Sequence, residues 1–125
     1  MAEATHSQSF QIERHGDTAI IIPSPEVEKM PFNLMEQAAQ MVLAPLKQGP
    51  PNGLIVDLSQ VNFFGSVFIS FLLRCHLLVK KQGAELVLAG VSDRVRELLR
   101  LTSLDTLWAL YASREEALEA LGGTD

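Results

Sequence analysis

Ser66 is the residue of this chain whose surroundings best suit chemistry. It follows Gly65, and the two stand between an apolar run at residues 54–58 and a long segment with helical spacing. If a strand ends and a helix begins there, unpaired backbone N–H groups lie beside the serine hydroxyl. Such groups stabilise a phosphate, so Ser66 is a candidate phosphoacceptor. The alternative is a structural role as the helix N-cap, in which the hydroxyl oxygen accepts from a free N–H.

The other reactive side chains do not have the spacing of a catalytic or metal site. His6, His15 and His76 fall in the N-terminal segment, a turn and a helix, so we predict no shared metal ion. Cys75 shares a helical face with apolar residues and is predicted to be a small core residue rather than a reactive thiol. Asp57 interrupts an apolar strand, and we predict that it caps the following turn rather than acts as a catalytic acid.

Motifs for enzymatic chemistry are missing from the sequence. It has no glycine-rich phosphate loop, no paired-histidine metal spacing and no nucleophile elbow. We therefore predict no catalytic residue, no metal and no cofactor, and the protein is not expected to be an enzyme. An enzyme or a nucleotide-binding protein remains only as a competing class.

Composition limits the location and the partners. A chain of 125 residues that is 47% hydrophobic suits one compact domain, which we place at residues 10–121 between a loose leader (1–9) and a tail (122–125). The net charge of −5 argues against a nucleic-acid partner. The N-terminus lacks the pattern of a signal peptide, and the longest apolar run is too short to cross a bilayer. We expect a cytoplasmic protein without membrane insertion.

The first half of the chain is predicted to form a hairpin and a helix. Residues 10–13 alternate between apolar and polar, residues 15–17 suit a turn, and residues 18–22 are apolar and β-branched. Further along, Asn33 and Glu36 have the spacing of a capping box at the start of a helix. Pro45 is expected to kink or end that helix, because proline lacks the N–H that the helix needs.

The second half is predicted to alternate strands and helices. Strands at 54–58 and 85–89 flank a helix from Ser66 to about Gln82, an arrangement that makes the two strands parallel neighbours. A short helix follows Ser92, a last strand is plausible at 107–111, and Ser113 with Glu116 suits a capping box for a final helix. The predicted fold class is α/β, a mixed sheet with an N-terminal hairpin and about four helices.

The helix after Ser66 has two apolar faces. Phe68, Leu72, Cys75 and Val79 share the face that must pack on the sheet. A second ridge of residues lies beside Ser66 and suggests a docking surface, unless a neighbouring helix covers it. The predicted partner-binding residues are Gly65, Ser66, Ile69, Ser70, Leu73, Arg74 and Leu77.

Three stretches together resemble a known family. They are Ile-Val-Asp-Leu-Ser-Gln-Val-Asn-Phe-Phe-Gly-Ser (55–66), Lys-Gln-Gly-Ala-Glu-Leu-Val-Leu-Ala-Gly-Val-Ser-Asp-Arg-Val-Arg-Glu-Leu-Leu (81–99) and Thr-Ser-Leu-Asp (102–105). Over residues 10–121 the chain is similar to the STAS domain of bacterial anti-sigma factor antagonists. In that family the strand–helix junction usually reads Asp, Ser, a small residue and Gly. Gly65, Ser66, Val67 and Phe68 stand at these positions, so the serine is kept and the aspartate and the later glycine are replaced.

The resemblance implies a STAS-like mixed sheet and a regulatory role. Members of the family bind an anti-sigma factor serine kinase and are switched by phosphorylation of the junction serine, which is Ser66 here. We expect a protein-interaction switch of this kind, an anti-sigma factor antagonist in transcription regulation. The alternative is a scaffold or accessory subunit of a stressosome-like or transporter complex that uses the fold without phosphorylation. The sequence predicts neither the identity of the partner nor the oligomeric state.

Overall fold

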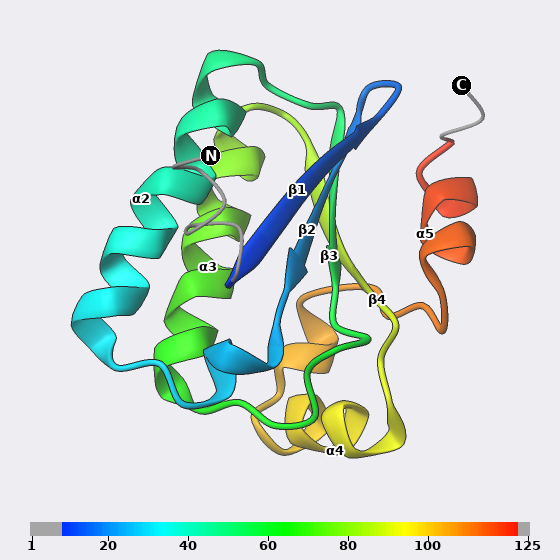
Figure 1. Ribbon diagram of the computed structural model, residues 1–125. Helices are drawn as coiled ribbons and strands as arrows, with labels where there is room; N and C mark the ends of the chain where they lie inside the picture. The colour runs from blue at the N-terminus through cyan, green and yellow to red at the C-terminus, as the bar shows by residue number, and fades with distance from the viewer. Residues whose placement is uncertain (1–8, 123–125) are drawn as a thin grey trace.

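The computed structural model describes residues 9–122, which build a four-stranded sheet with helices on both faces (Figure 1). The strands are β1 (Phe10–His15), β2 (Thr18–Pro23), β3 (Gly53–Asp57) and β4 (Glu85–Ala89), and they lie side by side in chain order. The first pair is antiparallel and the other two pairs are parallel. The predicted N-terminal hairpin and mixed sheet are therefore confirmed.

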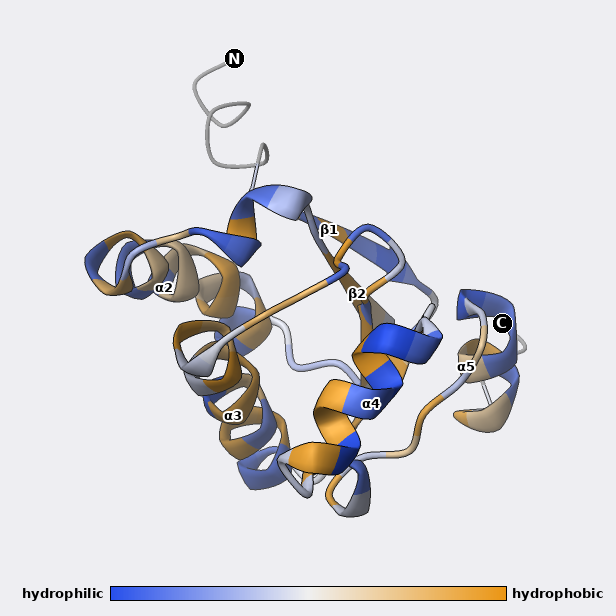
Figure 2. Cartoon of the chain, turned by 90° about the horizontal axis from the view of Figure 1, so that it is seen from below, coloured by the Kyte–Doolittle hydropathy of each residue, from blue (hydrophilic) through white to orange (hydrophobic). Residues whose placement is uncertain are grey.

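The helices divide unequally between the two faces of the sheet. On one face lie α2 (Phe32–Gln48), α3 (Ser66–Lys81) and α4 (Asp93–Leu101), with the 3-10 helices η1 (Pro25–Glu28) and η2 (Leu104–Thr106) in the connections. The other face is covered by α5 (Arg114–Ala120), which stands apart from the other helices in both views (Figures 1 and 2). Four α-helices in the described residues match the predicted number.

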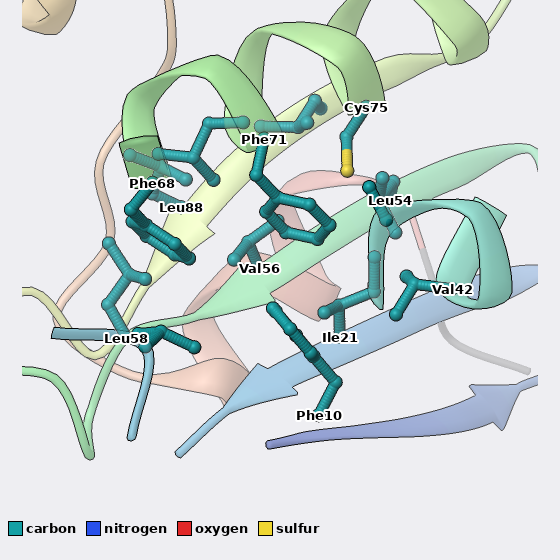
Figure 3. Packing of buried hydrophobic residues seen from close by; sticks show 14 of the residues in the cluster. Phe10, Ile21, Val42, Leu54, Val56, Leu58, Phe68, Phe71, Cys75 and Leu88 are labelled. Atoms are coloured by element: carbon teal, nitrogen blue, oxygen red, sulfur yellow. The ribbon is translucent and has the colours of Figure 1, made fainter. Parts of the chain in front are cut away.

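The main core lies between the sheet and α2 and α3 (Figure 3). Phe68, Leu72, Cys75 and Val79 of α3 are at most 1% exposed, so the predicted packing face of this helix is confirmed. Phe71 lies beside them, and its ring centroid is 4.8 Å from that of Phe10 on β1. Because α3 carries an apolar residue every three or four positions, this one face meets the sheet along the whole helix.

The opposite face of the sheet has a smaller core. Side chains point alternately to the two faces of a sheet, and β2, β3 and β4 carry apolar residues at successive positions. Both faces of these strands are therefore apolar, and the second face must also be covered. That cover comes from Ala117 of α5, which is fully buried. The strand residues beneath it are Ile20, Ile22, Ile55, Val87 and Ala89. A short C-terminal helix thus completes the three-layer arrangement.

One prediction about α2 is wrong, and one of the two expected effects of Pro45, the end of the helix, is excluded. Its N-cap is Pro31 rather than Asn33, and no side chain caps it, because the helix already includes Asn33. Glu36 instead pairs with Arg74 of α3. The helix also continues past Pro45 to Gln48. Pro45 lies on the exposed side, where water can satisfy the carbonyl group that the proline leaves unbonded.

The predicted last strand at residues 107–111 is also wrong. Leu110 forms a single parallel bridge with Leu88 of β4, and the preceding residues turn through η2. Ser103 before η2 adopts a left-handed conformation with φ of 62°, so the chain turns before it reaches residue 107. The predicted starts of α4 and α5 are confirmed. Ser92 caps α4, and Ser113 accepts from Glu116 N–H at 3.1 Å, although the Glu116 carboxylate reaches Ala112 N–H.

Candidate functional site

Ser66 is exposed and is the first residue of α3. The N-cap is Gly65, whose backbone is extended, and within residues 9–122 no side chain accepts a hydrogen bond from the first turn. The alternative role of Ser66 as the N-cap is therefore wrong, because the helix begins one residue too early for its hydroxyl to cap it. The hydroxyl stands at the surface, where another protein can reach it.

The charge at this end of α3 suits an anion. The first turn of the helix contains no acidic residue, while Lys80 and Lys81 occupy the last turn. Unpaired N–H groups give a helix N-terminus a positive partial charge, which acidic side chains usually offset in the first turn. In α3 no acidic side chain of the first turn offsets this positive partial charge. A phosphate on Ser66 would be stabilised by it.

The predicted ridge on α3 is only partly at the surface. Leu77 is 63% exposed, whereas Ile69 and Leu73 are half-buried and pack against the main core. Ser70 is exposed, and Arg74 donates to the Glu36 carboxylate of α2 across 2.9 Å. The neighbouring helix α2 thus contacts the ridge at Arg74, while Ser70 and Leu77 are exposed.

Two exposed aromatic side chains, one of them in the loop before Ser66, were not among the predicted site residues. Phe63 lies in the loop before α3 and is 44% exposed, and Phe32 at the start of α2 is 59% exposed. A hydrogen bond of 2.9 Å from Asn62 N–H to Glu28 ties this loop to η1. The sequence gives Phe63 and Phe64 the same chemistry, yet Phe64 is buried. The two neighbouring rings differ only in their place in the fold, since Phe63 is at the surface and Phe64 is in the core.

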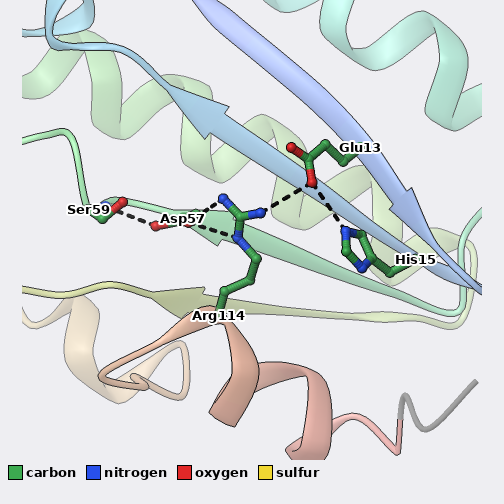
Figure 4. A network of polar contacts seen from close by, with 5 residues as sticks. All are labelled: Glu13, His15, Asp57, Ser59 and Arg114. Carbon is green, nitrogen blue, oxygen red and sulfur yellow. Dashed lines mark hydrogen bonds and ion pairs between the residues drawn. The ribbon is translucent and has the colours of Figure 1, made fainter.

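Asp57 caps the turn after β3, as predicted, and it also forms an ion pair with Arg114 (Figure 4). Its Oδ1 accepts from Ser59 N–H at 3.0 Å, and its Oδ2 accepts from Nε and Nη2 of Arg114 at 3.0 and 2.9 Å. Arg114 Nη1 also donates to Glu13 on β1, which contacts His15. Asp57 is only 4% exposed, so its carboxylate is largely shielded from water, whereas the Arg114 side chain is 28% exposed. The pairing was not predicted, because 57 residues separate the two partners.

The remaining titratable candidates do not form a reactive site. Burial raises the pKa of the Cys75 thiol to about 12, which keeps it protonated and confirms its core role. His76 Nδ1 accepts from the Trp108 indole N–H at 3.1 Å. Within residues 9–122 no three histidine, cysteine or carboxylate side chains converge as a metal site would require. His6 lies outside the described residues.

Comparison with known families decides the identity of the fold. Residues 10–117 match the STAS domain family. The chain belongs to this family. None of the curated proteins matches the chain. Among the helices of residues 9–122, none is long and apolar enough to cross a membrane.

Several solved structures share the fold. An anti-sigma-factor antagonist (STAS) domain protein from Planctomyces limnophilus is 29% identical with a TM-score of 0.78, and the match covers 90% of this chain and 97% of that one. The anti-sigma factor antagonist SpoIIAA in its unphosphorylated form is 20% identical with a TM-score of 0.75, covering 93% and 98%. A chain of the stressosome is 19% identical with a TM-score of 0.75, covering 90% and 96%.

Proposed function

We propose that this STAS protein is a cytoplasmic regulatory switch of the anti-sigma factor antagonist type, which binds an anti-sigma factor serine kinase and is phosphorylated on Ser66. The observation that carries the proposal is the exposed Ser66 at an uncapped helix N-terminus that has no acidic residue in its first turn. The protein has no catalytic role of its own in this proposal. Its output is the presence or absence of a complex.

The partner contacts the exposed side of α3. The proposed binding residues are Gly65, Ser66, Ile69, Ser70, Leu73, Arg74 and Leu77, and the exposed ring of Phe63 extends the surface at its N-terminal end. Leu77 and Phe63 supply apolar area that an interface can bury. Ser66 lies between them along the chain, so a charge added to its hydroxyl falls within the contact.

Phosphorylation acts on binding rather than on folding. A phosphoserine carries a charge of about −1.5 to −2 at neutral pH, and a helix N-terminus stabilises that charge. The same charge must be stripped of water when the partner binds, which is costly in an interface with apolar side chains. The phosphorylated protein is therefore the form that releases the partner.

The test is to incubate the protein with its cognate kinase and ATP and to locate phosphate by mass spectrometry. The expected result is modification of Ser66, none in Ser66→Ala, and full modification in Ser70→Ala, whose exposed serine lies one turn further along α3. Ser66→Asp should be at least as stable as the wild type and bind the partner about tenfold or more weakly. Wild-type binding by Ser66→Asp would contradict the switch.

A second candidate function is a STAS scaffold or accessory subunit, in a stressosome-like or transporter complex, that works without phosphorylation. The replacement of the family aspartate by Gly65 favours it, because the acidic neighbour of the serine is gone. A stable complex together with unmodified Ser66 in the native cell is the result expected from this candidate. A pull-down from native cytosol followed by phosphopeptide analysis separates the two candidates.

A further inference from the structure

Asp57 joins two parts of the protein that are distant in sequence. One carboxylate oxygen accepts from Ser59 N–H, at the start of the loop that leads to Ser66, and the other accepts from Arg114 on α5. The backbone of Gly90 closes over the first oxygen so tightly that a Cβ there would lie 2.6 Å from Oδ1 and 2.9 Å from Ser59 N. The carboxylate has little room to rotate.

The helix α5 crosses β3 and is attached at both ends of that strand. Arg114, at the start of α5, pairs with Asp57 at the end of β3. Leu121, just after α5, packs so closely on Gly53 at the start of β3 that a Cβ on Gly53 would lie 3.0 Å from Leu121 Cδ1. A helix of seven residues is marginal by itself, so α5 depends on these attachments.

We infer that Arg114 is a positioning residue for the loop that carries Ser66, and that it acts through Asp57. The inference rests on the proposed function of Ser66 for its biological meaning, but its structural part does not. Detachment of α5 at Arg114 loosens residues 58–65, whereas detachment at Leu121 leaves them held.

The physical link is the cost of an unpaired buried charge. Without Arg114, the Asp57 carboxylate lacks its cation in a position that is 4% exposed. It must regain water, and the neighbouring loop has to open to admit that water. The Ser59 N–H then loses an acceptor that is fixed in place. Loss of Leu121 packing removes apolar contact only and leaves both oxygens of Asp57 paired.

The experiment is amide hydrogen exchange on the full chain for the wild type, Arg114→Met and Leu121→Ala. The expected result is about tenfold faster exchange at residues 59–65 in Arg114→Met, with wild-type exchange there in Leu121→Ala, and faster exchange of α5 in both. The double variant Asp57→Asn/Arg114→Met should bring the loop back toward wild-type protection, because the buried charge is gone. If Arg114→Met does not fold, Arg114→Gln takes its place, since it also removes the cation but keeps an amide N–H that can donate to Asp57.

Equal loop exchange in Arg114→Met and Leu121→Ala would overturn the inference, because α5 would then act only through general stability. Unchanged loop exchange in Arg114→Met would overturn it as well. A last measurement adds cognate kinase and ATP to each variant. Slower phosphorylation of Ser66 in Arg114→Met than in Leu121→Ala supports the positioning role in function. If the exchange result holds and no variant is phosphorylated, the proposed switch fails while the positioning role stands.

Discussion

Ser66 is the first residue of α3, but its side chain does not cap the helix. Gly65 occupies the N-cap position with extended backbone angles, so the Ser66 hydroxyl has no capping role. An exposed serine that caps no helix can be modified, and it can also be substituted at little cost in stability. Because Gly65 occupies the N-cap and Ser66 does not, substitutions at these two residues should affect stability differently.

Ser66→Ala should change the free energy of unfolding by less than about 0.5 kcal/mol, because it removes no cap and no buried contact. Urea denaturation followed by circular dichroism is the measurement. Ser92→Ala is the matched control, since the Ser92 hydroxyl does cap α4, and its loss should cost about 1 kcal/mol. Equal losses in the two variants would mean that Ser66 holds the helix after all.

Gly65→Asp should stabilise the protein by about 0.5 to 1 kcal/mol. An aspartate at the N-cap accepts from the first-turn N–H groups, and a Cβ at Gly65 has no heavy atom within 4 Å. Gly83→Asp is the control, because that position is equally open but has φ of +79° and should lose about 1 kcal/mol. Thermal and urea unfolding of both variants test the prediction. A loss of stability in Gly65→Asp would contradict the N-cap assignment.

Cys75 should make stability fall at alkaline pH. The thiol ionises near 9.0 in the unfolded chain, whereas burial raises its pKa to about 12 in the folded protein. Above pH 9 the unfolded state therefore loses a proton that the folded state keeps, and unfolding is favoured. Between pH 8 and pH 10 the wild type should lose about 1.4 kcal/mol more than Cys75→Ala. Parallel pH dependence in the two proteins, by urea denaturation, would show that the thiol is not buried.

At the scale of elements, α3 uses its two sides differently. The side with Phe68 and Leu72 meets the sheet, and the side with Leu77 faces outward. The half-buried Ile69 and Leu73 lie between these extremes. The helix therefore serves the core and the candidate interface at the same time, and substitutions on its two sides should separate stability from binding.

Leu72→Ala should cost about 2 to 5 kcal/mol, since Leu72 is fully buried and its loss leaves a cavity in the main core. Leu77→Ala removes the same atoms from a side chain that is 63% exposed, and it should cost less than about 0.5 kcal/mol. Chemical denaturation of the two variants provides the comparison. A loss below about 0.5 kcal/mol in Leu72→Ala would mean that the assigned core face is wrong.

At the scale of the whole molecule, the sheet separates two unequal layers. The large core under α2 and α3 supports the Ser66 end, while α5 covers the second face and reaches the same end through Asp57. The candidate interface thus lies on the side of the sheet that has the main core. Its exposed residues, such as Leu77, can be changed without disturbing either core.

Leu77→Glu should weaken partner binding about tenfold or more and leave the unfolding free energy nearly unchanged, because the charge is tolerated in water but not in a desolvated contact. Met41→Glu on α2 is the control, an exposed apolar residue outside the proposed surface that should bind like the wild type. Calorimetric titration with the partner tests both. If Leu77→Glu retains full affinity, the proposed binding surface on α3 is wrong.

The sequence by itself determined the features that depend on neighbours along the chain. The apolar run before Asp57, the helical spacing after Ser66 and the capping serines Ser92 and Ser113 each follow from local chemistry, and the structure contains them all. The periodicity of α3 also identified its buried face, because a helix fixes which residues share a side.

Tertiary structure decided what depends on the meeting of distant segments. Glu36 has the spacing of a helix cap but pairs with Arg74, which lies 38 residues away. Residues 107–111 have strand-forming composition but gain only one bridge, because η2 turns the chain beside β4. The Asp57–Arg114 pair exists only where α5 crosses β3. The local sequence pattern determines which face of an element is apolar. Which charged side chains pair is decided only when packing brings distant segments together.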